Sequence, residues 1–144
     1  MVTPTPLVSP PGAELHDGVS DAMLAAEAKR LGLGLLVLFG SRARGDAHAS
    51  SDWDFAALSA TNEQLDSVRV ALSLVLQTDQ LDVADLSRAG ALVRHRIAAE
   101  GRLLYEAVPG SFLEFQLAAT QFWCDIEPVL RRVHSEILQE LKAS

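Results

Sequence analysis

Three aspartates in two short stretches of the chain are the residues best suited to do chemistry. Asp52 and Asp54 stand two positions apart, and Asp82 follows in the stretch LDVADL at 81–86. Residues two apart in a strand point to one face, so the first two carboxylates would lie side by side. Carboxylates that close repel each other unless a cation lies between them. Mg²⁺ takes oxygen ligands and keeps open positions for substrate phosphates. The pattern therefore indicates a magnesium site, which Asp82 would join from a neighbouring strand.

The residues just before these aspartates are suited to a phosphate. Gly40 and Ser41 follow an apolar run. Glycine permits a tight turn there, after which backbone amides and the Ser41 hydroxyl can point at an anion. Arg42 and Arg44 could neutralise the charge of a triphosphate, or each could be only a solvated loop charge. Two metal ions about 3.5–4 Å apart can hold the attacking and leaving oxygens of a displacement at phosphorus. Together these residues indicate a site for a nucleoside triphosphate and two Mg²⁺ ions.

Asp85 is the competing candidate for the third carboxylate. Asp82 and Asp85 are three positions apart, so in one strand only one of them can face the first two aspartates. Asp82 is the predicted member of the site, and Asp85 is predicted to have a capping or surface role near Ser87. A simpler alternative is that Ser41 only caps a helix and the first two aspartates are solvated strand ends. The spacing of the whole set favours the site.

Short strands must position these groups. The run LGLLVLFG at 33–40 is apolar on both faces and closed by glycine, which predicts a buried strand. The stretch DWDFAAL at 52–58 alternates, with Trp53 and Phe55 on one face and the two aspartates on the other. Further strands are predicted over 81–86 and, as a short last piece, over 102–106. The fold class is therefore α/β.

Helices are predicted between and after the strands. They run over 21–31 after the N-cap Ser20, from the cap Thr61 to about Gln77, and from Ser87 to Glu100. From Ser111 to the end, apolar residues recur every three or four positions, which predicts a long amphipathic helix or two helices joined near Pro128. The aromatic residues of this helical C-terminal third are predicted to be core, with a share of them available for a partner protein.

Composition limits the class of protein and its partners. Hydrophobic residues make up 49% of the chain and charged residues 22%, which is typical of a globular domain. The net charge of -7 argues against direct nucleic-acid binding, because a polyanion would be repelled. The single cysteine, Cys124, fits a reducing compartment, and no apolar run is long enough to cross a membrane. We predict a cytoplasmic protein with a flexible proline-rich arm at 1–14 and a single domain over 15–144, its C-terminal helix or helices starting at about 111.

The spacing of the candidate residues resembles a known signature. Gly40-Ser41, ten residues, then Asp52-Trp53-Asp54 is similar to the signature of nucleotidyltransferases of the DNA polymerase β superfamily. GSRARGDAHASSDWDFAAL followed by LDVADL resembles in particular the minimal nucleotidyltransferases (MNT), antitoxins that are paired with HEPN toxins. The stretch LVRHRIAAEGRLLYE resembles the segment after the third strand of that family. The resemblance covers 20–144 and implies a small mixed β-sheet flanked by helices.

The same resemblance implies roles for individual residues. It assigns Gly40 and Ser41 to the triphosphate and Asp52 and Asp54 to the metal, with Asp82 as third carboxylate and candidate general base. It implies transfer of AMP from ATP, with Mg²⁺ as cofactor, to a tyrosine of a cognate HEPN RNase toxin, which is silenced. The chain would then be an antitoxin that forms a complex with its toxin. The signature is complete here, which argues against an inactive copy.

Three other interpretations compete with this one. An enzyme that adenylylates an antibiotic hydroxyl would carry the same signature, although little chain remains to build an acceptor pocket. An antitoxin that only binds and occludes its toxin would need no catalysis. Arg42 with His48, and Arg88 with His95, also fit the loose arginine–histidine pattern of HEPN ribonucleases. Because HEPN domains are helical and Arg42 follows a strand and a glycine turn, the toxin interpretation is rejected.

Overall fold

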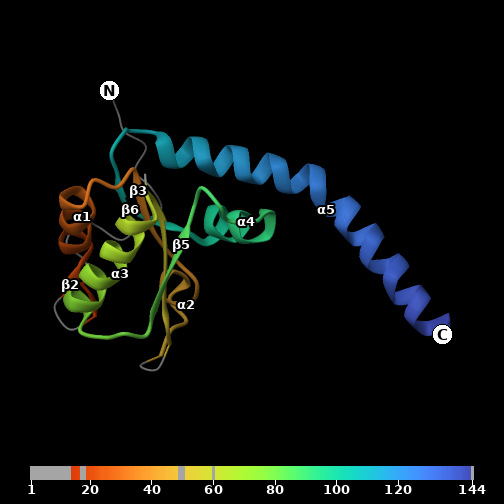
Figure 1. The fold of residues 1–144 in the computed structure, drawn as a ribbon, viewed down its shortest axis with the longest axis horizontal. Coiled ribbons are helices and arrows are strands. Elements are labelled where there is room, and N and C mark those ends of the chain that lie inside the picture. The colour runs from red at the N-terminus through yellow and green to blue at the C-terminus, as the bar shows by residue number, and fades with distance from the viewer. Residues whose placement is uncertain (1–13, 17–18, 49–50, 60, 144) are drawn as a thin grey trace.

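The fold is a mixed four-stranded sheet with helices on both faces and a long C-terminal helix (Figure 1). The computed structural model describes residues 14–16, 19–48, 51–59 and 61–143. Along the described chain the elements are β1 (Glu14–His16), β2 (Val19–Ser20), α1 (Asp21–Arg30), β3 (Leu35–Phe39), α2 (Ser41–Arg44), β4 (Trp53–Leu58), α3 (Asn62–Leu76), β5 (Leu81–Asp85), α4 (Ala91–Glu100), β6 (Arg102–Glu106) and α5 (Ser111–Ala143). The predicted fold class is confirmed.

The main sheet has the strand order β5-β4-β3-β6. β3 pairs antiparallel with both β4 and β6, whereas β4 and β5 are parallel. β1 and β2 form a separate antiparallel pair, which was not predicted. Of the proline-rich stretch at 1–14, residues 1–13 lie outside the described part, so the division into arm and domain stays a prediction.

The two faces of the sheet have different covers because side chains alternate along each strand. On one face, Leu36, Leu38 and Phe55 pack with buried residues of α1 and α3. On the other face, Val37 and Ala56 pack with buried residues of α4 and α5. Figure 1 shows α1 and α3 on one side of the sheet and α4 on the other. A surface hollow of about 450 Å³ between α1 and α3 therefore lies on the face opposite to α4.

The predicted helix caps at Ser20 and Thr61 are confirmed. The Ser20 hydroxyl accepts a hydrogen bond from the Met23 amide at 3.3 Å, and the Thr61 hydroxyl accepts one from the Gln64 amide at 3.1 Å. Each bond satisfies one of the amide groups that the first turn of a helix leaves without a backbone partner.

The predicted start of the third helix is wrong. α4 begins at Ala91 rather than at Ser87, with Gly90 as its N-cap. The Ser87 amide and hydroxyl both donate to Oδ1 of Asp85, at 2.9 and 2.6 Å. These bonds close a local turn, and a serine engaged in such a turn no longer caps a helix. The predicted capping role of Asp85 near Ser87 is confirmed.

The C-terminal third is one helix, α5, with Pro128 inside it. In Figure 1 it runs over α4 and changes direction about half-way along, as expected where proline removes a backbone hydrogen bond. Phe112 and Ala119, in its first half, are buried, and the ring of Trp123 stacks on His95 of α4 at 5.0 Å. Phe122, predicted as either core or partner surface, is 53% exposed.

Apolar side chains recur every three or four positions in the second half of α5, and many of them are exposed. Its exposed large apolar side chains are Val129, Leu130, Val133, Ile137, Leu138 and Leu141. In the described residues, no helix has both the length and the apolar character needed to span a membrane. These side chains form an uncovered apolar stripe along the second half of α5.

Candidate functional site

Strand pairing brings the two halves of the predicted motif together at one place on the sheet. Phe39 of β3 lies opposite Asp54 of β4, which sets Gly40 beside that aspartate. On the other side of β4, Asp54 lies opposite Asp82 of β5. Asp54 shares its sheet face with Ala56, so both aspartates lie on the face that α4 covers in part. Asp85 lies opposite Ala57, on the other face.

Gly40 is in close contact with Asp54. Its φ of 74° is in the left-handed region that favours glycine. A Cβ atom at this position would overlap Oδ2 of Asp54 and lie 3.2 Å from its Cγ. The short helix α2 then begins at Ser41, and the amides of Ala43 and Arg44 both donate to the Gly40 carbonyl at 3.1 Å. The turn at Gly40 therefore leads the chain from β3 closely past the Asp54 carboxylate.

Arg42 is engaged with the loop that leads into β4. Its Nε and Nη2 donate to the Ser51 carbonyl at 3.2 and 2.9 Å, and its guanidinium lies 4.2 Å from the centre of the Trp53 ring. Asp52 lies between these two contacts in the sequence. These contacts give Arg42 a role in holding the backbone around Asp52, between Ser51 and Trp53. The predicted contact of Arg42 with a triphosphate stays a prediction.

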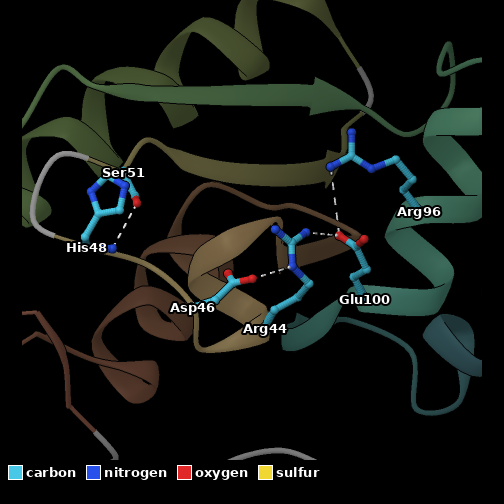
Figure 2. A network of polar contacts seen from close by, with 6 residues as sticks. All are labelled: Arg44, Asp46, His48, Ser51, Arg96 and Glu100. Carbon is cyan, nitrogen blue, oxygen red and sulfur yellow. Dashed lines mark hydrogen bonds and ion pairs between the residues drawn. The ribbon is translucent and has the colours of Figure 1, made fainter.

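A second cluster of charges lies between α2 and α4. Arg44 donates to Asp46 at 3.2 Å and to Glu100 of α4 at 3.0 Å, and these contacts raise the pKa of the Arg44 guanidinium. Arg96, one turn before Glu100, lies 3.9 Å from the same carboxylate. Figure 2 shows both guanidinium groups directed at Glu100 from different elements. His48 is joined to Ser51 within the neighbouring loop, its amide donating to the Ser51 hydroxyl at 3.0 Å.

The electrostatics of Asp54 reflect all of these neighbours. Partial burial raises the pKa of the Asp54 carboxyl, and the negative charges of Asp82 and then Asp52 raise it further. Arg96 and, less strongly, Arg44 lower it. The three predicted carboxylates therefore repel one another, with two arginines close enough to act on the central one. A cation among them would relieve this repulsion.

The acidic side chains of the site are not arranged as a set of metal ligands in this structure. In the part of the chain that the structure describes, no group of three or more His, Cys, Asp or Glu side chains is arranged to hold a metal ion. The Asp82 carboxylate is turned toward Arg69 of α3, with Oδ1 3.2 Å from Nη2, and both side chains are mostly exposed. Rotation of Asp82 away from Arg69 would direct a third carboxylate toward Asp54. The carboxylates of Asp52, Asp54 and Asp82 offer the oxygen ligands that a hard divalent cation prefers, and such a cation would offset their mutual repulsion.

Sequence reasoning missed the position of Arg96. The run Arg94-His95-Arg96 carries no signal in the sequence that assigns Arg96 to the site. Arg94 in fact donates to the Leu86 carbonyl at 2.6 Å and lies over the Phe115 ring. Ile97, the next residue after Arg96, is fully buried against the sheet. One feature of the sequence could have pointed to Arg96. It stands next to an apolar residue, Ile97, on the helix that follows the third predicted strand.

Comparisons with known proteins agree with this arrangement. The family described as "Polymerase beta, Nucleotidyltransferase" matches residues 27–109. The protein adenylyltransferase MntA of Aphanizomenon flos-aquae (strain 2012/KM1/D3) is 34% identical over 96 residues, which cover 58% of this chain. The match spans 64% of the length of that relative, somewhat less than two thirds.

Solved structures share the fold. A crystal structure of a toxin-antitoxin with AMP-PNP aligns with a TM-score of 0.66 at 20% identity, covering 79% of this chain and 98% of its own. The complex of a tri-AMPylated Shewanella oneidensis HEPN toxin with an MNT antitoxin aligns with a TM-score of 0.61 at 17% identity, covering 82% of this chain and 98% of its own. Since the family match includes Gly40, Asp54 and Asp82 and extends over more than half of the sequence, the chain belongs to the polymerase beta nucleotidyltransferase family.

Proposed function

We propose that this chain is a Mg²⁺-dependent adenylyltransferase that moves AMP from ATP to a tyrosine hydroxyl of a cognate HEPN toxin and thereby acts as its antitoxin. Membership in the family supports nucleotidyl transfer. The similarity to a protein adenylyltransferase supports AMP as the group and a protein as the acceptor. The structural likeness to complexes described as toxin-antitoxin with AMP-PNP and as tri-AMPylated HEPN toxin supports ATP and the toxin partner.

One observation of the fold carries the proposal. Gly40, Asp54 and Asp82 come from stretches far apart in the sequence, and the pairing of β3, β4 and β5 places them next to one another on one sheet face. Partial burial and then the charges of Asp82 and Asp52 raise the pKa of the Asp54 carboxyl. A site that binds a metal-bound triphosphate needs both this oxygen-rich cluster and a backbone that passes closely beside it.

Each residue has a distinct task in this proposal. Gly40 and Ser41 hold the triphosphate beside the carboxylates, and Asp52, Asp54 and Asp82 hold the metal ions. Mg²⁺ in this site supplies neutralisation of the phosphate charge and orientation of the α-phosphate. The acceptor oxygen bonds to the α-phosphorus as the bond to the bridging oxygen breaks, and pyrophosphate leaves. As general base, Asp82 accepts the proton of the acceptor hydroxyl; its carboxylate is 73% exposed, so an acceptor can reach it.

The partner is proposed to bind in part through α5. The apolar stripe of its second half is exposed, with Ile137 at 50% and Leu141 at 66%. Exposed apolar patches of this kind are typical of protein interfaces. The net charge of -7 would also steer a basic, RNA-cutting partner toward this chain. A cytoplasmic location is part of the proposal and rests on the single cysteine, Cys124, which fits a reducing compartment.

The decisive experiment follows the mass of the partner. The chain is co-expressed with the helical protein of the neighbouring reading frame, and the purified partner is incubated with the chain, ATP and Mg²⁺. We expect the partner mass to rise in steps of one AMP unit, on tyrosine. Asp54→Asn should abolish the increase, and Asp82→Ala should abolish it while Asp85→Ala retains most of it, because Asp85 lies on the other sheet face.

The outcomes separate the competing functions. A complex that forms without any mass increase would favour an antitoxin that acts by binding alone. Modification of a small antibiotic without modification of the partner would favour the small-molecule enzyme. Full transfer by Asp54→Asn in the presence of Mg²⁺ would refute the metal assignment.

A further inference from the structure

α4 lies on the sheet face that carries the acidic site. Ile97 of α4 is fully buried and packs in the same cluster as Ala56 of β4 and Val37 of β3. Ala56 is two residues after Asp54 on the same strand and shares its face. Arg96 precedes Ile97, so this packing fixes its backbone on α4, from where its charge acts on the Asp54 carboxyl. Figure 2 shows its side chain reaching from α4 toward the strands.

Arginines near the site differ in how strongly they are engaged. Arg42 is bonded to the Ser51 carbonyl, Arg44 to two carboxylates and Arg94 to the Leu86 carbonyl. Within the described part of the chain, the one ion pair of Arg96 is with Glu100, at 3.9 Å, which exceeds hydrogen-bond distance. Among the described residues, its guanidinium donates no hydrogen bond, and its side chain is 47% exposed. It is thus the arginine of this group whose donors are open to a ligand.

Resting on the proposed function, we propose that Arg96, oriented by Glu100, binds the β- and γ-phosphates of the bound ATP. A planar guanidinium presents paired N–H donors that match phosphate oxygens. Oε2 of Glu100 lies 3.0 Å from Nη1 of Arg44 and 3.9 Å from Nη2 of Arg96, so the oxygen that faces Arg96 is already bonded to Arg44 and leaves the Arg96 donors unsatisfied. Arg96 would then lie across the site from the backbone turn at Gly40.

Arg96 in this position would act on the charge of the leaving pyrophosphate. When the acceptor oxygen bonds to the α-phosphorus, the electron pair of the broken bond stays on the bridging oxygen of pyrophosphate. Negative charge therefore grows on the group that Arg96 contacts, and the proton of the acceptor goes to Asp82 rather than to the leaving group. A fixed cation beside the leaving group stabilises this charge more in the transition state than in bound ATP.

The test compares binding of two nucleotides without acceptor protein. Isothermal titration calorimetry with MgATP and with AMP is performed on the full chain and on Arg96→Ala, Arg96→Lys and Arg132→Ala. Arg132 is an exposed residue of α5, so its variant changes net charge equally. Loss of a charge-assisted phosphate contact should weaken MgATP binding roughly tenfold. AMP affinity should stay the same, since AMP lacks the β- and γ-phosphates. Arg96→Lys should recover part of the loss, and Arg132→Ala should match the full chain.

Several results would overturn the inference. Unchanged MgATP affinity in Arg96→Ala, beside normal binding by the full chain, would refute it and leave the proposed function standing. Equal weakening of MgATP and AMP would assign Arg96 a structural role only. Unchanged MgATP affinity with a raised KM for the partner protein would assign it to the acceptor. Failure of the full chain itself to bind MgATP would count against the proposed function, and the inference would fall with it.

Discussion

Replacing Gly40 with alanine tests how closely the phosphate turn and the acidic site are coupled. Two costs add at this position. At φ 74° and ψ −160°, a backbone region open almost only to glycine, a residue with a Cβ costs about 1–3 kcal/mol. The new methyl would also overlap Oδ2 of Asp54, and relief of such overpacking costs about 1–3 kcal/mol more. We expect Gly40→Ala to lower the free energy of unfolding by about 2–6 kcal/mol and to abolish AMP transfer, because the Asp54 carboxylate must move.

A matched control separates the two costs. Gly45 also has a positive φ, 85°, but a Cβ there would meet nothing within 4 Å. Gly45→Ala should therefore cost only about 1–2 kcal/mol. In an Asp54→Ala background the overlapping carboxylate is absent, so the cost of Gly40→Ala should fall by about 1–3 kcal/mol, to the backbone cost alone. Urea unfolding of the single and double variants measures these differences. An equal cost of Gly40→Ala in both backgrounds would refute the proposed coupling of the turn to Asp54.

Three further predictions concern the site and α5. Because partial burial and then the charges of Asp82 and Asp52 raise the pKa of Asp54, its charged form destabilises the fold; Asp54→Asn without metal should be more stable than the parent at pH 7 in thermal melts, with the gain fading as the pH falls through the raised pKa and absent below 3.8, the ordinary value. Arg42→Ala should speed hydrogen exchange at the Ser51–Trp53 amides and lower transfer at least about tenfold, and Arg42→Lys should not restore it. Ile137→Asp should prevent co-elution with the partner at an unchanged melting temperature, whereas Gln139→Asp, on the opposite side of α5, should co-elute normally.

Local rules predicted much of the fold because the relevant interactions are short in sequence. Ser20 and Thr61 cap helices through amides three residues away, and both were identified from residue type alone. The period of two placed Asp54 and Asp82 on one face once their strands were paired. The failure at Ser87 has an equally local cause, since Asp85 competes for the same hydroxyl and amide that a helix cap would use.

Arg96 and the direction of Asp82 could not be predicted in this way. The position of Arg96 depends on the docking of α4 through Ile97 on strands that are remote in the sequence. Asp82 turns to Arg69, a residue of the preceding helix that no motif connects with it. Such side-chain contacts depend on tertiary packing. The sequence pattern predicted the strand and the sheet face of Asp82, but not its contact with Arg69.

Two parts of this chain remain unfavourable in isolation, and they differ in kind. The site around Asp54 partly buries this carboxyl and places like charges beside it, and both effects raise its pKa. The end of α5 exposes an apolar stripe that includes Val133 and Ile137. A hard cation with a triphosphate would relieve only the first, and an apolar protein surface would cover only the second. Departures from local rules are expected at functional sites. The acidic site requires a cation, whereas the exposed stripe of α5 requires an apolar surface, so no single small ligand satisfies both. This difference favours a transferase that works on a bound protein partner.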